Sequence, residues 1–301
     1  MNRDILVRVV SYRDPELLHT IGSAWERAAD PARVRFAIVN QVGPETQHQL
    51  DAVRGDGRVT SVALPWRSAR GLGWARRMTD RMRRDERYTL QVDSHTRFAD
   101  GWDEALVAQW ESLRDPRAVL SCYPGAFAPV GGDFGADAGA VAQTTVPPHA
   151  IVPAGQDQHG LPRQDVGPSV PGLARTALVS GGFQFSAGAL CSELEQVRDV
   201  MVADEHVRAL QLFTHGWNVH APESVPLFHL YARDKPAGGH GFLSDFAGDP
   251  GARGVLELLL ARSIDTARAI ISGGGGGALG RERSRADFDA AVAALPQRSR
   301  R

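Results

Sequence analysis

Lysine is nearly absent from this sequence of 301 residues, because Lys235 is the only one among 34 basic residues. Arginine therefore carries almost all of the positive charge, and 35 acidic residues bring the formal net charge to -1. A surface that follows a nucleic-acid backbone should leave a basic excess, so this composition argues against a nucleic-acid partner. The arginine bias, with abundant alanine and glycine, suggests a GC-rich bacterial genome.

Cysteine is also scarce, since Cys122 and Cys191 lie far apart and neither has a partner motif around it. A disulfide framework and a zinc knuckle are therefore not expected. No stretch approaches the roughly 20 consecutive apolar residues of a membrane span. The first residues enter a strand pattern at once and lack the charged head and apolar stretch of a signal peptide. We expect a soluble cytoplasmic protein with no membrane partner.

Strand and helix patterns alternate through the first 120 residues, which favours an α/β fold with a mostly parallel sheet covered on both faces. In such sheets, ligands bind at the carboxyl ends of the strands. The chain is 43% apolar and long enough for one large domain. The predicted strands are Ile5–Val10, Val34–Asn40, Val59–Leu64 and Tyr88–Asp93. The predicted helices begin at Pro15, with Asp14 as the N-cap, at Arg70 and at Trp102.

The pattern dissolves between Gly125 and Arg175 into glycine, proline and alanine, so we expect an irregular insertion there. Periodicity then returns for the rest of the chain. The later elements that we predict are helices over Glu193–Val202, Asp204–Thr214, Gly254–Ile271 and Asp287–Leu295 and a strand over Pro226–Arg233. The SGGGGG tract before the last helix is expected to be flexible.

The strand that ends at Asp93 leads directly into His95, which puts a carboxylate and an imidazole two positions apart. Residues i and i+2 point the same way on an extended chain, so both can address one ion. Oxygen and nitrogen donors together suit Mn²⁺, Fe²⁺ or Zn²⁺. A third ligand should come from another strand, and we choose His229. The competing interpretation is that Asp93 caps the turn and His229 is a core histidine, because a single D-x-H is a weak signal.

Two further pairs of charged residues accompany this motif. Arg76 and Arg77 lie early in a predicted helix, where an arginine can pair with a pyrophosphate through two hydrogen bonds. A solvated basic helix face is the alternative. Asp204 and Glu205 open a later helix, where they either favour its positive end or contact sugar hydroxyls.

The chain resembles glycosyltransferase family 60, the cytoplasmic polypeptide N-acetylglucosaminyltransferases that act on hydroxyproline. Seven ordered motifs carry the resemblance across most of the chain, and the LQVDSH run is the most specific. These motifs are VSYRDPELLHTI (10–21), WARRM (74–78), LQVDSHTRFADGWDEAL (90–106), GGFQFSAG (181–188), ADEH (203–206), LFTHGWNVHAP (212–222) and HLYAR (229–233). The chain departs from the family in two places: it has Ala203, Asp204 and Glu205 where the family often has a Gly-Glu-Glu triplet, and Gln211 where an arginine is expected.

The resemblance implies a GT-A fold, a UDP-linked sugar donor, a bound Mn²⁺ or Mg²⁺ and transfer with retention of anomeric configuration. It also implies site residues, which are carried over by position. Asp93 and His95 match the family's D-x-D variant, and His229 matches the late histidine that completes the metal ligands. The donor-binding residues would be Ser11, Tyr12, Arg13, Arg76, Asp93 and Ser94, and the catalytic acidic pair would be Asp204 and Glu205.

The same resemblance divides one glycosyltransferase domain over residues 1–301 into three parts. Residues 1–120 would bind the nucleotide sugar, and residues 121–271, with the insertion at 125–175, would form the acceptor side. Residues 272–301 would be a glycine-rich segment and a last helix. That segment is either a hinge that closes over the donor or a loose linker.

The expected function is transfer of GlcNAc or a related hexose from a UDP-sugar to a hydroxyl of a peptide, a protein or a natural product. Two alternatives remain open at this stage. The first is a non-haem iron(II) oxygenase, in which Asp93, His95 and His229 form the facial triad, although the usual order of that triad is His-x-Asp. The second is a non-catalytic module that binds nucleotide sugars.

Overall fold

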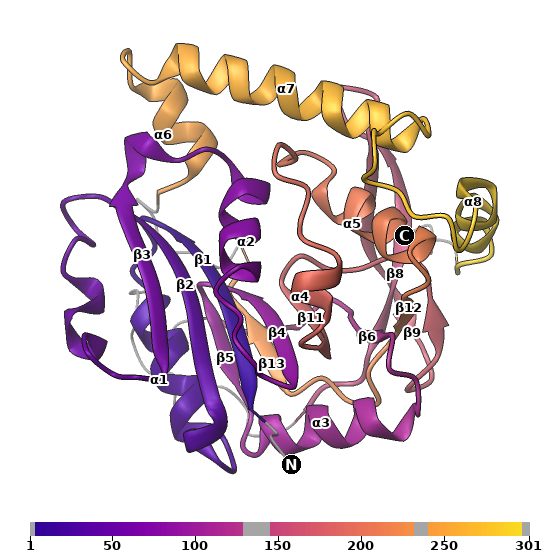
Figure 1. Ribbon diagram of the computed structural model, residues 1–301, viewed down its shortest axis with the longest axis horizontal. Coiled ribbons are helices and arrows are strands. Elements are labelled where there is room, and N and C mark those ends of the chain that lie inside the picture. The colour runs from indigo at the N-terminus through magenta and orange to yellow at the C-terminus, as the bar shows by residue number, and fades with distance from the viewer. Residues whose placement is uncertain (1–3, 129–144, 232–239, 297–301) are drawn as a thin grey trace.

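A computed structural model of the protein describes residues 4–128, 145–231 and 240–296 (Figure 1). Its centre is a mixed sheet of eight strands in the order β10-β12-β6-β11-β4-β1-β2-β3. The bounds of these strands are β1 Ile5–Tyr12, β2 Val34–Val42, β3 Val59–Pro65, β4 Tyr88–Asp93, β6 Ala118–Leu120, β10 Arg175–Thr176, β11 Phe183–Ala187 and β12 Asn218–His220. The α/β prediction is therefore confirmed, and the four early strands lie where the sequence predicts them.

The first four strands of the sheet are parallel, and the mixed character begins at β11. β1 pairs with β2 on one side and with β4 on the other, and β2 pairs with β3, all in parallel. β11 is antiparallel to β4 and β6. The carboxyl ends of β1, β2 and β4 therefore lie at one edge of the sheet, as the alternating pattern predicts.

Helices cover both faces of the sheet. Alternate residues of β1, such as Val7 and Val9, share a core with Leu17 of α1 and Trp102 of α3. On the opposite face Arg8 contacts Asp80 of α2. The helix bounds are α1 Leu17–Arg27, α2 Leu72–Asp80, α3 Trp102–Ser112, α4 Leu190–Glu193, α5 Asp204–Thr214, α6 Phe242–Gly248, α7 Arg253–Ile271 and α8 Arg285–Ala293, with short 3-10 turns at Pro31–Arg33, Gln49–Val53 and Trp66–Ser68.

A second, three-stranded sheet brings the late part of the chain beside the end of β4. Its order is β5 (Thr96–Phe98), β13 (Leu227–His229) and β7 (Gly125–Ala126). β13 is antiparallel to β5, so that His229 faces Thr96, and the Leu230 N–H donates to the His95 carbonyl at 3.0 Å. This pairing explains how residues more than a hundred positions apart reach one site.

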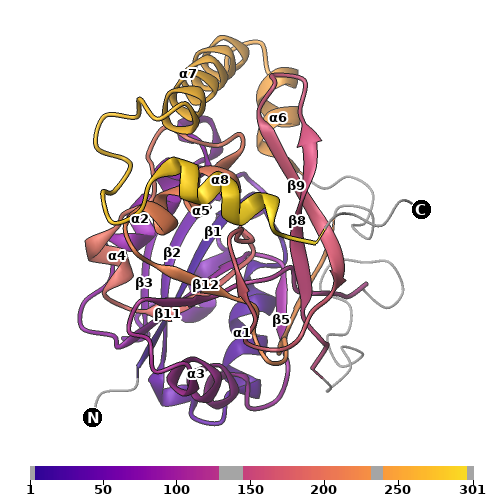
Figure 2. The ribbon, with the colours of Figure 1, turned by 90° about the vertical axis from the view of Figure 1, so that its right-hand side faces the viewer.

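The irregular insertion predicted over 125–175 is only partly irregular. β8 (His149–Gln156) and β9 (Pro162–Ser169) form an antiparallel hairpin, which runs along one side of the molecule in Figure 2. Prolines at both strands and glycines at the bulges hide the strand pattern, because these residues normally interrupt strands. Residues 129–144 of the predicted insertion lie outside the described residues.

The helix predicted over Glu193–Val202 is wrong, since α4 ends at Glu193 and a loop leads to α5. The reason is the close packing of this loop on α2. A Cβ on Gly73 would lie 2.2 Å from the carbonyl oxygen of Val197, and the Gly73 N–H donates to the carbonyl of Val200 at 3.0 Å. These tertiary contacts with the loop backbone outweigh the local helix propensity.

The C-terminal helices follow the prediction closely. α7 begins one residue before the expected Gly254, and α8 begins two residues before the expected Asp287. α8 starts at a capping box formed by Ser284 and Asp287, and its Phe288 is buried against α5. In both views α6 and α7 lie at the same end of the molecule (Figures 1 and 2). Among the described residues, none of the helices is both long and apolar enough for a membrane span.

Candidate active site

A pocket of about 320 Å³ opens at the carboxyl ends of the parallel strands. One wall comes from the strand ends, with Tyr12 as the last residue of β1 and Asp93 as the last residue of β4. The opposite wall is apolar and comes from Phe242 and Leu243 of α6 and Leu260 of α7. The remaining lining residues are Val10, Asp14, Gln41, Gly71, Leu72, Ser94, His95, Met201, Val202, His240 and Gly241. A pocket with one apolar wall and a few converging polar groups is typical of a small-molecule site.

Asp93, His95 and His229 form a cluster at this pocket, as the sequence predicts. One ligand atom from each lies within 4.8 Å of the others. His229 Nε2 and Asp93 Oδ2 are 3.0 Å apart, and the His95 and His229 rings are 4.6 Å apart between centroids. Burial alone would raise the pKa of Asp93, but the hydrogen bond with His229 and the charges of His95 and Arg76 lower it. The carboxylate is therefore ionised and available as a ligand.

Asp14 orients the cluster, although the sequence suggests only a helix cap for it. His95 Nδ1 donates to Asp14 Oδ2 at 2.6 Å, and Ser94 Oγ donates to the same oxygen at 2.8 Å. This pairing leaves His95 Nε2 as the free ring nitrogen. Asp14 also accepts the Glu16 N–H, and α1 begins only at Leu17. The sequence holds a signal for this role, because Asp14 lies two residues after the carboxyl end of β1, which pairs with β4.

Arg76 connects this cluster to the acidic pair. Its side chain is nearly buried, at 7% exposure. Nη1 donates to Asp204 Oδ2 at 2.6 Å, and Nη2 donates to the Gly181 carbonyl at 3.2 Å and lies 3.9 Å from Asp93 Oδ1. Arg77 points elsewhere and pairs with Glu195 at 2.6 Å. Of the two arginines that the sequence singles out, only Arg76 reaches the site.

Glu205 is held by three hydrogen bonds at the start of α5. Its carboxylate accepts the Gly181 N–H at 2.6 Å, Tyr123 Oη–H at 3.0 Å and Gln164 Nε2–H at 2.8 Å. Burial and the neighbouring Asp204 raise its pKa to about 7, although the hydrogen bonds from Gly181 and Tyr123 and the charge of Arg76 oppose this. Burial, together with the charge of Glu205, also raises the pKa of Tyr123. Tyr123 and Gln164 were not predicted, and nothing near them in the sequence marks them as site residues.

This raised pKa predicts how stability depends on pH. The folded state should bind the Glu205 proton more tightly than the unfolded state, so stability should fall as pH rises from 4.5 to about 7. In calorimetric scans between about pH 5 and about pH 8, wild-type Tm should therefore fall relative to that of Glu205→Gln. Parallel pH profiles of the two proteins would contradict the raised pKa.

Gly181 and Gly182 occupy the space between the acidic pair and the Asp93 cluster. A Cβ on Gly181 would lie 2.7 Å from Arg76 Nη2, and a Cβ on Gly182 would lie 3.1 Å from Asp93 Oδ2. The Gly181 carbonyl also accepts a hydrogen bond from Gln91 Nε2 at 2.8 Å. The glycines of the GGFQFSAG motif thus allow the close approach of charged side chains to this turn.

The three residues expected after β1 have different environments. Tyr12 lines the pocket, and burial, with the charge of Asp245, raises its pKa. Ser11 is buried behind the strand end. Arg13 does not line the pocket, because its guanidinium pairs with Glu45 at 2.7 Å and Asp245 at 2.7 Å. Arg13 thus connects the end of β1 to α6, which forms the opposite wall.

Ala203, directly before the acidic pair, has a left-handed backbone with φ of 51°. Glycine adopts this conformation without strain, so Ala203→Gly should stabilise the protein by about 0.5–1 kcal/mol in denaturant unfolding. The matched control is Ala209→Gly in the middle of α5, which should destabilise it by about 1 kcal/mol or more. If Ala203→Gly destabilises the protein, the backbone of Ala203 is not strained in the way proposed here.

The fold is similar to the GT-A fold of solved glycosyltransferase structures. The solved GalNAc-T7 structure with UDP, GalNAc and Mn²⁺ has a TM-score of 0.59 and 16% identity, and the match covers 79% of this chain and 45% of that one. S. aureus TarS 1–349 with UDP-GlcNAc has a TM-score of 0.55 and 11% identity, over 96% of this chain and 70% of that one. The mannosyltransferase PcManGT from Pyrobaculum calidifontis with GDP-Man and Mn²⁺ has a TM-score of 0.50 and 15% identity, over 98% and 80%.

The sequence itself identifies the family within this class. The family model described as Glycosyltransferase (GlcNAc) matches residues 42–238, which is more than half of the chain. The chain therefore belongs to this glycosyltransferase family and is an enzyme of the GT-A type. A search of curated proteins found no match. The chain spans less than half of the GalNAc-T7 chain, so that protein's other segments have no counterpart in the match.

Proposed function

We propose that this enzyme transfers GlcNAc or a related hexose from a UDP-sugar to a hydroxyl group of a peptide, a protein or a natural product. The observation that carries the proposal is the position of Asp93, His95 and His229 at the carboxyl edge of β4, beside the pocket. The GlcNAc family match supports the donor sugar. UDP in the solved GalNAc-T7 and TarS structures supports the nucleotide, although PcManGT was solved with GDP-Man.

The residues present fit a divalent metal ion such as Mn²⁺ or Mg²⁺. One carboxylate and two imidazoles provide a mixed oxygen and nitrogen donor set that suits a divalent ion such as Mn²⁺. The 3.0 Å between His229 Nε2 and Asp93 Oδ2 equals the spacing of adjacent ligands about 2.1 Å from one octahedral ion. Asp14 would keep His95 Nε2 directed at the ion through its hydrogen bond with Nδ1. When bound, the ion supplies Lewis-acid stabilisation of the departing diphosphate.

The protein side chains would complete the electrostatics of the reaction. Breaking the bond between the sugar and the diphosphate leaves negative charge on the phosphate, and Arg76 would stabilise that charge from a preorganised position. Asp204, whose oxygen meets Arg76 at 2.6 Å, would hold sugar hydroxyls. Tyr12 and Ser94 line the pocket and would contact the donor. Arg13 would act indirectly, by fixing the α6 wall.

We further propose retention of configuration without a strong base. The acceptor hydroxyl would enter on the face of the departing diphosphate and give its proton to a phosphate oxygen. The hairpin of β8 and β9 supports an acceptor side here, because Gln164 of β9 reaches Glu205. Glu205 would be the other member of the catalytic pair. Within the GT-A glycosyltransferases, we propose that this enzyme is a bacterial, cytoplasmic member of glycosyltransferase family 60.

The stereochemistry is tested by NMR of the sugar released from UDP-α-GlcNAc with Mn²⁺ present. Retention predicts that the α-anomer appears first, before mutarotation. Initial release of the β-anomer would contradict it. Mass spectrometry of the rapidly quenched enzyme adds a second test, because a sugar covalently attached to Asp204 or Glu205 would indicate double displacement instead.

Asp14→Asn should weaken metal binding. The change removes the charge that orients His95, and loss of such an outer partner typically lowers metal affinity by about 10–100-fold. Mn²⁺ titration followed by electron paramagnetic resonance measures the effect. Asp56→Asn is the control, because Asp56 pairs with Arg58 and does not line the pocket. Equal Mn²⁺ affinity of wild type and Asp14→Asn would show that Asp14 does not support metal binding through His95.

Two alternatives are distinguished by specific results. The oxygenase hypothesis expects a β-sandwich-like barrel, whereas the chain has a GT-A fold and belongs to a glycosyltransferase family. A non-catalytic module would bind a UDP-sugar with Mn²⁺ but would neither hydrolyse nor transfer the sugar. The intact Asp93 cluster and the contact of Arg76 with Asp204 favour the enzyme.

A further inference from the structure

The backbone on either side of Gly181 contacts two charged side chains of the candidate active site. The peptide group between Ser180 and Gly181 donates its N–H to Glu205 Oε1 at 2.6 Å. The carbonyl of the next peptide group, between Gly181 and Gly182, accepts Arg76 Nη2 at 3.2 Å. Glycine adopts many backbone conformations at little cost, so two consecutive glycines do not fix the orientation of these peptide groups by themselves. Hydrogen bonds from other segments are needed to hold them.

Two buried glutamines supply such hydrogen bonds, one to each peptide group. Gln184 of β11 donates from Nε2 to the Ser180 carbonyl at 3.0 Å, and Gln91 of β4 donates from Nε2 to the Gly181 carbonyl at 2.8 Å. The two glutamines are register partners in the antiparallel pair of β4 and β11, and Gln91 and Gln184 are 2% and 1% exposed. Within the turn, the Gly182 N–H also donates to Ser180 Oγ at 3.1 Å. Each peptide group that contacts a charged side chain is thus held at its carbonyl by a glutamine of the sheet.

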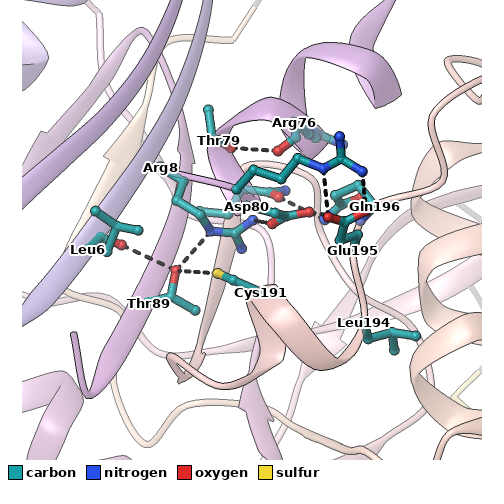
Figure 3. Close-up of polar contacts among 12 residues, drawn as sticks. Leu6, Arg8, Arg76, Thr79, Asp80, Thr89, Cys191, Leu194, Glu195 and Gln196 are labelled. Atoms are coloured by element: carbon teal, nitrogen blue, oxygen red, sulfur yellow. Dashed lines mark hydrogen bonds and ion pairs between the residues drawn. The ribbon is translucent and has the colours of Figure 1, made fainter. Parts of the chain in front are cut away.

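The amide of Gln91 is itself held by buried charged residues on the α2 side of the sheet. Its Oε1 accepts Gln196 Nε2 at 3.1 Å, and the Gln196 N–H donates to Asp80 Oδ2 at 2.8 Å. Arg8 pairs with the other oxygen of Asp80, and Figure 3 shows Arg8, Asp80 and Gln196 together. Buried networks in which the polar groups are paired are rigid. The Gln91 side chain is therefore fixed with Nε2 directed at Gly181.

The side chain of Gln184 is not explained by stability alone. Its Oε1 is buried and has no hydrogen-bond donor in the described part of the chain. An unpaired buried amide oxygen destabilises the folded state. The contact of Gln184 Nε2 with the Ser180 carbonyl gives this costly side chain a purpose, because that carbonyl belongs to the peptide group whose N–H meets Glu205.

We propose that Gln91 and Gln184 are positioning residues of the active site. Gln184 orients the N–H that binds Glu205, and Gln91 orients the carbonyl that holds Arg76. Neither glutamine is among the residues that line the pocket, so each acts through the backbone of Gly181 and not by contact with the donor. The effect on catalysis rests on the proposed transferase function, whereas the effect on the backbone does not.

Steady-state kinetics of Gln91→Met and Gln184→Met tests the effect on catalysis. Methionine has a side chain of similar length that cannot donate a hydrogen bond. Each variant should lower kcat by about 100-fold, because small displacements of catalytic groups have effects of that size. The Kd of UDP in the presence of Mn²⁺ should stay at the wild-type value.

The control for both variants is Gln109→Met. Gln109 is also buried, at 6% exposure, but its amide bonds the backbone of Glu223 and Ser224 and it does not line the pocket. This variant should keep the wild-type kcat even if its Tm falls. Wild-type kcat in both Gln91→Met and Gln184→Met, or equal losses of kcat and UDP affinity, would show that these glutamines only support the fold.

NMR of isotope-labelled protein tests the effect on the backbone without an enzyme assay. Above the Glu205 pKa of about 7, the short hydrogen bond to the carboxylate should place the Gly181 amide proton far downfield in wild type and in Gln109→Met. It should move upfield in Gln184→Met, and the Gly182 amide, which shares a peptide group with the Gly181 carbonyl, should shift in Gln91→Met. Unchanged resonances in both variants would overturn the positioning role. A wild-type protein that neither transfers nor hydrolyses a UDP-sugar would instead contradict the proposed function.

Discussion

His229→Ala is expected to lower the affinity for Mn²⁺ by more than about 100-fold, because losing a direct ligand should exceed the effect of losing an outer partner. Mn²⁺-dependent binding of the nucleotide should disappear with it. His229 is the ligand that comes from a distant strand, at 3.0 Å from Asp93, and no neighbouring side chain replaces it in the described cluster. Isothermal titration of the variant with Mn²⁺, and then with UDP, measures both effects.

The control for this variant is His19→Ala, because His19 is exposed on α1 and does not line the pocket. Asp93→Ala should behave as His229→Ala does, since both contribute to the same three-ligand cluster. Metal-dependent nucleotide binding retained in both Asp93→Ala and His229→Ala would remove the metal-site assignment. Circular dichroism of each variant must match the wild type, so that a folding defect is not taken for a binding defect.

Arg76→Gln is expected to lower kcat by about 10²–10³-fold, which is typical for removal of one preorganised electrostatic donor. The variant also leaves Asp93 and Asp204 without the cation that lies between them. Arg76→Lys should recover only part of the rate, because an ammonium group cannot keep the two-pronged contacts of guanidinium with Asp204 and Gly181. Steady-state kinetics with the UDP-sugar measures the effect.

Arg77→Gln is the matched control for this experiment. It changes the adjacent residue of the same helix, whose guanidinium pairs with Glu195 away from the pocket. Its kcat should stay within about twofold of wild type, since a partly exposed ion pair of this kind contributes little. Equal losses in both variants would mean that helix α2, and not the Arg76 side chain, is responsible.

The sequence predicts those parts of the fold that depend on local pattern. β-rich runs at regular intervals identify β1 to β4, and the apolar period identifies α5 and α7. The hairpin of β8 and β9 could not be predicted, because its prolines and glycines are typical of loops and only the pairing of the two strands makes them a sheet. The loop after Glu193 is held open by contacts with Gly73, which local propensity does not describe.

The site residues also divide into those that local sequence pattern predicts and those that only tertiary contacts bring together. Asp93 and His95 are predictable from spacing at a strand end, whereas His229 is only a candidate on a late predicted strand until the pairing of β13 with β5 brings it to the site. Tyr123 and Gln164 meet Glu205 only through tertiary structure. Arg13 was expected to contact the donor, but it does not line the pocket. Two carboxylates from other segments, Glu45 and Asp245, pair with its guanidinium instead. Long-range charge pairing of this kind leaves no local pattern in a sequence.

The most direct test of the account is calorimetric titration of the purified protein with UDP, GDP and dTDP, each with and without Mn²⁺. The account predicts tight binding of UDP that requires Mn²⁺, with much weaker binding of GDP and dTDP. No binding of any nucleotide in the presence of Mn²⁺, especially together with binding of 2-oxoglutarate in the presence of Fe²⁺, would contradict it.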